Sequence, residues 1–221
     1  MILVGQYDSP YVRRVAIALR ELGFDYTHDT RSVFGDFEDM RKTNPLSRIP
    51  SLILDDGTTL IDSAAILDWL DEAVGEGRAL LAAAGSERQR QLQVIALASG
   101  AIDKAGAAAY ERIIRPERYR WPDWMARCRT QAAGALAALA AIDWADLRAS
   151  YAPTHPPLHA EIITACLIRY VRMTDPALLE GSAHALLEGS AHASLIALSA
   201  RLEARPAFIA TCPPDVAYPK G

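Results

Sequence analysis

The sequence predicts an α/β region followed by an all-helical region, and three observations support this fold class. Over the first 77 of the 221 residues, short strand-like apolar runs alternate with helix-spaced apolar faces. After Gly77 the chain is rich in Ala and Leu and shows only helical spacing. The net charge changes at the same point, from −7 in residues 1–77 to +3 in the remainder. We therefore expect two domains, residues 1–77 and residues 86–221.

Local signals place the first elements. Residues 2–4 form a short apolar run, and Ser9 and Pro10 have the residue types of a helix N-cap and first helical position. Apolar residues then recur at helical spacing as far as Leu22, and Gly23 provides a stop signal. A second strand is expected over residues 24–28.

The same reasoning continues to Gly77. A short polar helix is expected over residues 37–42, and the turn at residues 55–57 joins two strands, 51–54 and 59–61, into a hairpin. Asp62 and Ser63 then open a helix that ends at Gly75. The predicted order is β-α-β-α-β-β-α.

Composition excludes several classes of protein. The chain is 51% hydrophobic and 23% charged with a net charge of −4, which is typical of globular proteins and not of nucleic-acid or membrane-surface binders. The longest uncharged run, residues 130–142, is too short to span a bilayer, and no signal peptide is expected. The three cysteines Cys128, Cys166 and Cys212 form no C-x-x-C motif, which is typical of free thiols in a reducing compartment. A cytoplasmic location is therefore expected.

An octapeptide, A-L-L-E-G-S-A-H, occurs twice in succession at residues 177–184 and 185–192. Two copies are too few for a solenoid. We interpret them as a tandem duplication that lengthens an exposed surface connection, since insertions in such places cost little stability. Metal binding by its two histidines is the alternative, but no other ligand lies at a suitable spacing.

Three short motifs carry the chemistry: Y-D-S-P-Y-V-R at residues 7–13, N-P-L-S-R-I-P at residues 44–50, and I-D-S at residues 61–63. At these positions the chain resembles the glutathione transferase superfamily, whose members join a thioredoxin-like domain to a helical one. The resemblance covers essentially the whole length, including the closing segment at residues 201–208, and the S-P-Y-V-R start is most similar to small bacterial transferases.

The resemblance implies a binding site for glutathione. Ser63 begins a helix whose free N–H groups suit the γ-glutamyl carboxylate, and Asp62 can pair with the amine. Ile49 and Pro50 resemble the cis-proline segment that pairs with the cysteinyl backbone, and Arg48 can reach the glycyl carboxylate. Purely structural roles remain open: helix capping, an ordinary trans-proline and a solvated charge.

Ser9 is the catalytic candidate, because a hydroxyl donor at a helix N-terminus favours a bound thiolate. Tyr7 is the rival hydroxyl, since some classes of the superfamily use a tyrosine at the end of the first strand. Serine in place of cysteine before Pro10 argues against disulfide exchange, which requires a protein thiolate.

The electrophile is expected to bind between the two domains. Candidates to line that cleft are Tyr11, Tyr110, Ile114, Trp121 and Trp124, although ordinary helix packing explains each of them equally well. Six arginines within residues 112–129 are interpreted as a solvated hairpin tip, and any that face the cleft would favour an acidic electrophile.

The sequence therefore predicts a cytoplasmic glutathione transferase that conjugates glutathione to a small electrophile, a chemistry associated with detoxification. Glutathione is the expected co-substrate, and the resemblance implies a homodimer with no metal, nucleic acid or membrane partner. Isomerase, dehalogenase and peroxidase chemistry remain open. The alternative function is a non-catalytic binding or interaction module that kept the fold.

Overall fold

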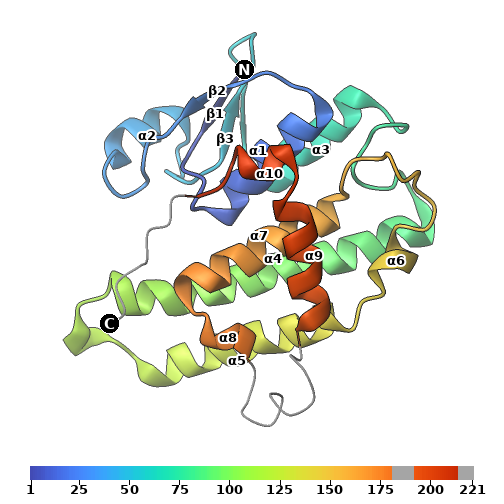
Figure 1. Cartoon of the computed structure of the whole chain (residues 1–221). Coiled ribbons are helices and arrows are strands. Elements are labelled where there is room, and N and C mark those ends of the chain that lie inside the picture. The colour runs from blue at the N-terminus through green and yellow to red at the C-terminus, as the bar shows by residue number, and fades with distance from the viewer. Residues whose placement is uncertain (181–191, 214–221) are drawn as a thin grey trace.

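The computed structural model describes residues 1–180 and 192–213 (Figure 1). The first part has the predicted order of strands and helices, which is that of a thioredoxin-like domain. The elements are β1 (Ile2–Val4), α1 (Pro10–Leu22), β2 (Thr27–Asp29), α2 (Phe37–Thr43), β3 (Ser51–Ile53), β4 (Thr59–Ile61) and α3 (Ser63–Val74). In Figure 1, α2 lies on one side of the sheet, and α1 and α3 lie on the other.

The sheet gathers three loops at one end. Its strand order is β2-β1-β3-β4, with β1 parallel to β2 and antiparallel to β3, and with β3 antiparallel to β4. Val4 pairs with Ser51, and Ser51 pairs with Ile61. The residues that follow β1, precede β3 and follow β4 therefore meet at the same end of the sheet, and these are the three segments that carry the sequence motifs.

The second part of the described chain is helical, as predicted. Its elements are α4 (Gly85–Ile113), η1 (Glu117–Tyr119), α5 (Pro122–Ala140), α6 (Trp144–Leu147), α7 (His159–Thr174), α8 (Ala177–Glu180), α9 (Ala193–Glu203) and α10 (Pro206–Ile209). The long helices α4 and α5 run side by side, and α7 packs against α4, α1 and α9 (Figure 1). None of the helices in the described part of the chain is long and apolar enough to cross a membrane.

Helix α7 joins two hydrophobic cores because its opposite faces are both buried. Ile162 and Cys166 pack into the core formed by the sheet, α1 and α3, whereas Ile163 and Leu167 pack into the core between α4 and α5. Each fully buried aliphatic side chain of this kind contributes about 1.5–3 kcal/mol. The predicted division into residues 1–77 and 86–221 remains a prediction, and the first core already contains residues from both ranges.

Arg13 connects α1 to the end of the described chain through hydrogen bonds. Its side chain is 1% exposed, and its two terminal nitrogens donate to the Glu203 carboxylate at 2.7 and 2.6 Å. Its remaining bonds go to the carbonyl oxygens of Thr211 and Phe208. A buried guanidinium is tolerated when it is paired and hydrogen-bonded in this way. The closing segment identified in the sequence is therefore held against α1.

The second strand starts later than predicted. Residues 24–28 were expected to be extended, but β2 covers Thr27–Asp29. Gly23 ends α1 in a left-handed conformation, and the Phe24 N–H bonds the Leu19 carbonyl oxygen at 2.8 Å. The chain is thus still completing the helix cap at Phe24, so pairing with β1 begins only afterwards.

Three described residues of the duplicated octapeptide are buried, although an exposed connection was expected. Residues 181–191 lie outside the described residues. Leu178 and Leu179, in α8, are buried in the second core, and His192 is buried with Nδ1 3.3 Å from the Leu179 carbonyl oxygen. The prediction of an exposed connection is therefore wrong for these three residues. Leu178 and Leu179, from the first copy, pack into the hydrophobic core of the helical part.

Gly5 occupies a position at which a side chain has no room. Its φ is +127°, and a Cβ there would lie 2.6 Å from Val12 Cγ2 and 2.8 Å from Ile49 Cβ. This contact fixes the distance between the loop after β1 and the loop that contains Ile49. The loop that contains Ile49 borders the cavity described below.

We predict that Gly5→Ala lowers the free energy of unfolding by about 2–4 kcal/mol, because it adds overpacking to an unfavourable backbone conformation. Gly57→Ala is the matched control, since its φ is +87° but no atom lies within 4 Å of the added Cβ. The control should lose only about 1–2 kcal/mol. Urea unfolding of both variants measures the difference, and equal losses would contradict the packing argument.

Candidate functional site

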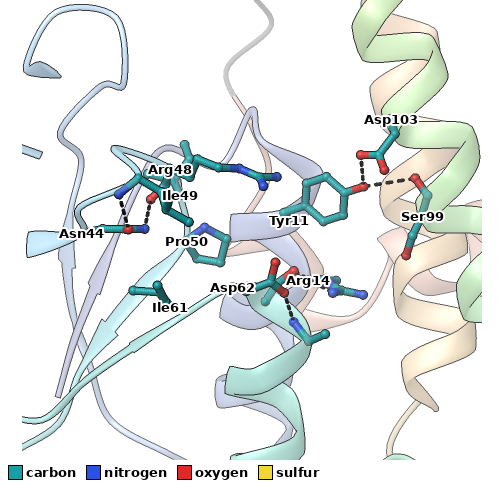
Figure 2. Close-up of a pocket in the computed structure, with 13 residues that line it drawn as sticks. Tyr11, Arg14, Asn44, Arg48, Ile49, Pro50, Ile61, Asp62, Ser99 and Asp103 are labelled. Carbon is teal, nitrogen blue, oxygen red and sulfur yellow. Dashed lines mark hydrogen bonds between the residues drawn. The ribbon is translucent and has the colours of Figure 1, made fainter. Parts of the chain in front are cut away.

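A cavity of about 360 Å³ opens at this end of the sheet, where the loop before β3 and the start of α3 face α1 and α4 (Figure 2). Its size falls within the range of small-molecule sites. One wall comes from the start of α3, a second from the loop before β3, and a third from α1 and α4. Of the residues predicted to bind glutathione, the lining contains Arg48, Ile49, Pro50, Asp62 and Ser63.

The start of α3 forms the first wall. Asp62 is the N-cap residue, and its carboxylate accepts from the Ala64 N–H at 2.8 Å. Its φ of +73° is uncommon outside glycine, although aspartate tolerates it better than most residues. Ser63 follows as the first helical residue and is 3% exposed. Free N–H groups at this end give the wall a positive potential.

The loop before β3 forms the second wall and is held by Asn44. This side chain is buried, donates to the Arg48 carbonyl oxygen at 2.8 Å and accepts from the Leu46 N–H at 2.9 Å. The Ile49–Pro50 peptide bond is cis, as the sequence comparison with the superfamily led us to expect. Arg48 is exposed at the mouth, so its guanidinium remains available to solvent or to a ligand.

Tyr11 closes the third wall by connecting α1 to α4. Its hydroxyl donates to Asp103 Oδ1 at 2.6 Å and also lies 3.0 Å from the Ser99 carbonyl oxygen (Figure 2). Burial, and then the bond to Asp103, raises the pKa of Tyr11, so the phenol remains a neutral donor at physiological pH. Tyr11 lines this first cavity, and its predicted contact with the electrophile stays a prediction.

Ser9 and Tyr7 lie in different environments. Ser9 is the N-cap of α1, and its Oγ accepts from the Val12 N–H at a long 3.4 Å. It is half-buried and precedes Tyr11 by two residues, but it is not among the residues that line the cavity. The Tyr7 hydroxyl bonds the Tyr26 hydroxyl at 2.8 Å, its ring stacks on His28, and burial raises its pKa.

The other residues predicted to contact the electrophile lie at or near a second cavity. Tyr110, Ile114 and Trp124 line a second cavity of about 450 Å³ at the far end of α4. Trp121 is 61% exposed and does not line it, although its ring stacks on Trp124 with centroids 6.4 Å apart. Of the six arginines in this region, Arg115 lines the cavity and is paired with the buried Glu111 at 2.9 Å.

Sequence reasoning missed four polar residues of the first cavity: Arg14, Asn44, Ser99 and Asp103. Arg14 falls outside the apolar stripe expected for α1, so it was indistinguishable from a solvated charge. In the structure α1 is buried on nearly all sides, and Arg14 is only 5% exposed. The sequence of α1 held no signal for this burial, because three arginines and a glutamate among its 13 residues give it the pattern of an ordinary amphipathic helix.

Comparison with known proteins agrees with this architecture. Residues 3–78 match the family described as "Glutathione S-transferase, N-terminal domain". A glutathione transferase family member from Pseudomonas fluorescens, solved with bound glutathione, superposes with a TM-score of 0.80 at 32% identity, covering 96% of this chain and 98% of that one. A glutathione S-transferase from Methylobacterium radiotolerans, in complex with glutathione sulfonate, gives 0.79 at 28% identity, covering 96% and 94%.

A curated relative, the uncharacterized GST-like protein YibF of Escherichia coli, is 30% identical over 129 residues, which are 58% of this chain and 63% of that protein. The alignments span between 47% and 63% of the length of the curated relatives that the chain matches. The chain belongs to the glutathione S-transferase family.

We predict that Tyr11→Phe lowers the free energy of unfolding by about 1–2 kcal/mol, because it removes the bond between α1 and α4 and leaves Asp103 without this donor. Tyr119→Phe serves as the control, since Tyr119 is 58% exposed and lies outside both cavities. Urea unfolding reports both values. No loss in Tyr11→Phe would show that this bond does not hold the helices together.

Proposed function

We propose that the protein binds glutathione in the first cavity and transfers the glutathione thiolate to a small electrophile. The observation that carries this proposal is that the start of α3 and the loop with Arg48, Ile49 and Pro50 line the same cavity. The glutathione bound in the Pseudomonas fluorescens relative supports it.

The cavity offers a partner for each charged part of glutathione. Ser63 and the N-terminus of α3 face the γ-glutamyl carboxylate, and Asp62 pairs with the amine. Arg48 pairs with the glycyl carboxylate at the mouth. Ile49 pairs its backbone with the cysteinyl residue, as an added strand would. The charges of Arg14, Arg48, Asp62 and Asp103 cancel, which suits a ligand that carries both signs.

Ser9 is the hydroxyl that we assign to the thiolate. Among the described residues its Oγ accepts only a long bond from Val12, which leaves the hydroxyl proton available for donation. Lowering a thiol pKa from about 8.5 by two units requires about 2.7 kcal/mol. One charge-assisted hydrogen bond supplies about 1.5–3 kcal/mol, and the N-terminus of α1 adds to it. Tyr7 is less suited, because its hydroxyl is engaged by Tyr26.

The electrophile is proposed to bind in the second cavity. Asp103 lines the first cavity, and Ala107 and Tyr110 line the second, so the two hollows follow one another along the same helix. Four residues advance a helix by about 6 Å. The pKa of Tyr110 is raised by burial and then by the Asp8 carboxylate, which indicates that the segment before Ser9 lies near Tyr110. This arrangement supports placing Ser9 between the two hollows.

The chain's own thiols are not part of this proposal. Cys128 and Cys166 are buried, and Cys212 is exposed but belongs to neither cavity. Burial raises the pKa of Cys166 to about 12, so it stays protonated. The thiolate in the reaction is therefore that of glutathione.

We predict that Ser9→Ala lowers the rate of conjugation to an aryl halide about 10- to 100-fold at pH 6.5, because less of the bound glutathione is ionised. The deficit should shrink toward pH 9.5, where the thiol ionises without help. Steady-state pH–rate profiles of the wild type and the variant measure this.

Ser9→Thr is the matched control, since it retains both the hydroxyl and the N-cap and should keep most of the activity. A Ser9→Ala profile that coincides with the wild type would remove Ser9 from its role. Calorimetric titration with glutathione separates the remaining possibilities: binding without turnover of any electrophile supports a binding module, and no heat at millimolar glutathione contradicts both functions.

A further inference from the structure

Strand β2 and the residue before it hold the loop between β1 and α1. The Gly5 N–H donates to the Asp29 carbonyl oxygen at 2.8 Å, and His28 Nε2 lies 2.7 Å from the Gly5 carbonyl oxygen. The Tyr7 hydroxyl bonds the Tyr26 hydroxyl at 2.8 Å. The loop that leads to the N-terminus of α1 is therefore tied along its length to one short segment of the sheet edge.

His28 contacts this loop at two points, on either side of Gln6 in the sequence. A carbonyl oxygen can only accept, so His28 Nε2 carries a hydrogen and donates it to Gly5. The imidazole ring also stacks on the Tyr7 ring, with the ring centroids 3.9 Å apart and the planes inclined by 10°. The hydrogen bond fixes the direction of the imidazole, and the stack fixes its face. One side chain thus holds Gly5 and Tyr7 relative to each other.

Ser9 depends on the part of the loop that His28 holds. The Ser9 N–H donates to the Gln6 carbonyl oxygen at 3.2 Å, and Gln6 lies between the two residues that His28 contacts. Gln6 itself is exposed, so little packing of its own keeps this carbonyl in place. A shift of the Gln6 carbonyl would therefore move the backbone of Ser9 and redirect its hydroxyl.

We propose that His28 is a positioning residue for conjugation: it holds Gly5 and Tyr7 so that the Ser9 hydroxyl faces the glutathione sulfur. This inference rests on the proposed function, because it assigns a support to the hydroxyl that stabilises the thiolate. It also gives Tyr7 a role, as the ring on which His28 stacks. His28 lines neither cavity, so its loss should slow the reaction of bound glutathione and leave the binding of glutathione unchanged.

The first test separates rate from binding in His28→Ala, which removes both contacts. At pH 6.5 and saturating glutathione, kcat with an aryl halide should fall about 5- to 20-fold, because a displaced hydroxyl stabilises the thiolate less well. This loss should be smaller than that of Ser9→Ala. The dissociation constant of glutathione, measured by calorimetry, should stay within about twofold of the wild-type value.

The second test asks whether His28 acts through Ser9. In a Ser9→Ala background the hydroxyl is already missing, so adding His28→Ala should lower kcat by less than about twofold further. A further loss as large as the one in the wild-type background would show that His28 acts on another part of the reaction. That result would overturn the inference.

Milder variants and a matched control complete the set. His28→Gln keeps an N–H donor and His28→Phe keeps the stacked ring, so each should recover part of kcat, and both serve if His28→Ala does not fold. His155→Ala is the control, because His155 bonds a carbonyl oxygen through Nδ1 at 2.8 Å and contacts the Tyr151 ring but lines neither cavity. It should lose stability and keep the wild-type kcat.

The outcomes are distinguishable. Folded His28 variants that keep the wild-type kcat overturn the inference, as does a loss that appears only in the dissociation constant of glutathione. In both cases the wild type still conjugates glutathione, and the proposed function stands. A wild type that conjugates no electrophile overturns the proposed function, and this inference falls with it.

Discussion

Two adjacent guanidinium groups, those of Arg13 and Arg14, are buried on α1, and the surrounding structure is organised to accommodate them. Arg13 points toward the closing segment, where Glu203 neutralises it. Arg14 points toward Ser63 and the cavity. Because a buried charge is costly without a partner, one helix constrains both the end of the described chain and the start of α3.

The position of α1 then determines where chemistry can occur. Tyr11 bonds α4 through Asp103, and Gly5 lets the loop after β1 approach Ile49 closely. Both contacts lie around the N-terminus of α1, where Ser9 is the cap. In the proposed function, glutathione lies on one side of this terminus and the electrophile on the other, so the same contacts set the geometry of the two substrates.

Local signals in the sequence predicted most of the fold and part of the candidate site. Ser9 before Pro10, Gly23 after α1, and Asp62 before α3 are caps whose residue types act within a few positions, and all three are observed. The burial of Leu178 and Leu179 could not be predicted, because it depends on helices distant in sequence. The contact between Arg14 and the start of α3 was missed for the same reason, because Ser63, which accepts its hydrogen bond, lies 49 positions along the chain.

A structure of the wild-type protein with glutathione is the most direct test of the central claim that the first cavity is the glutathione site and Ser9 faces its sulfur. We expect the γ-glutamyl carboxylate at Ser63, the cysteinyl backbone beside Ile49, and the sulfur within hydrogen-bonding distance of Ser9 Oγ. Glutathione bound elsewhere, or with its sulfur beside Tyr7 and away from Ser9, would contradict the account.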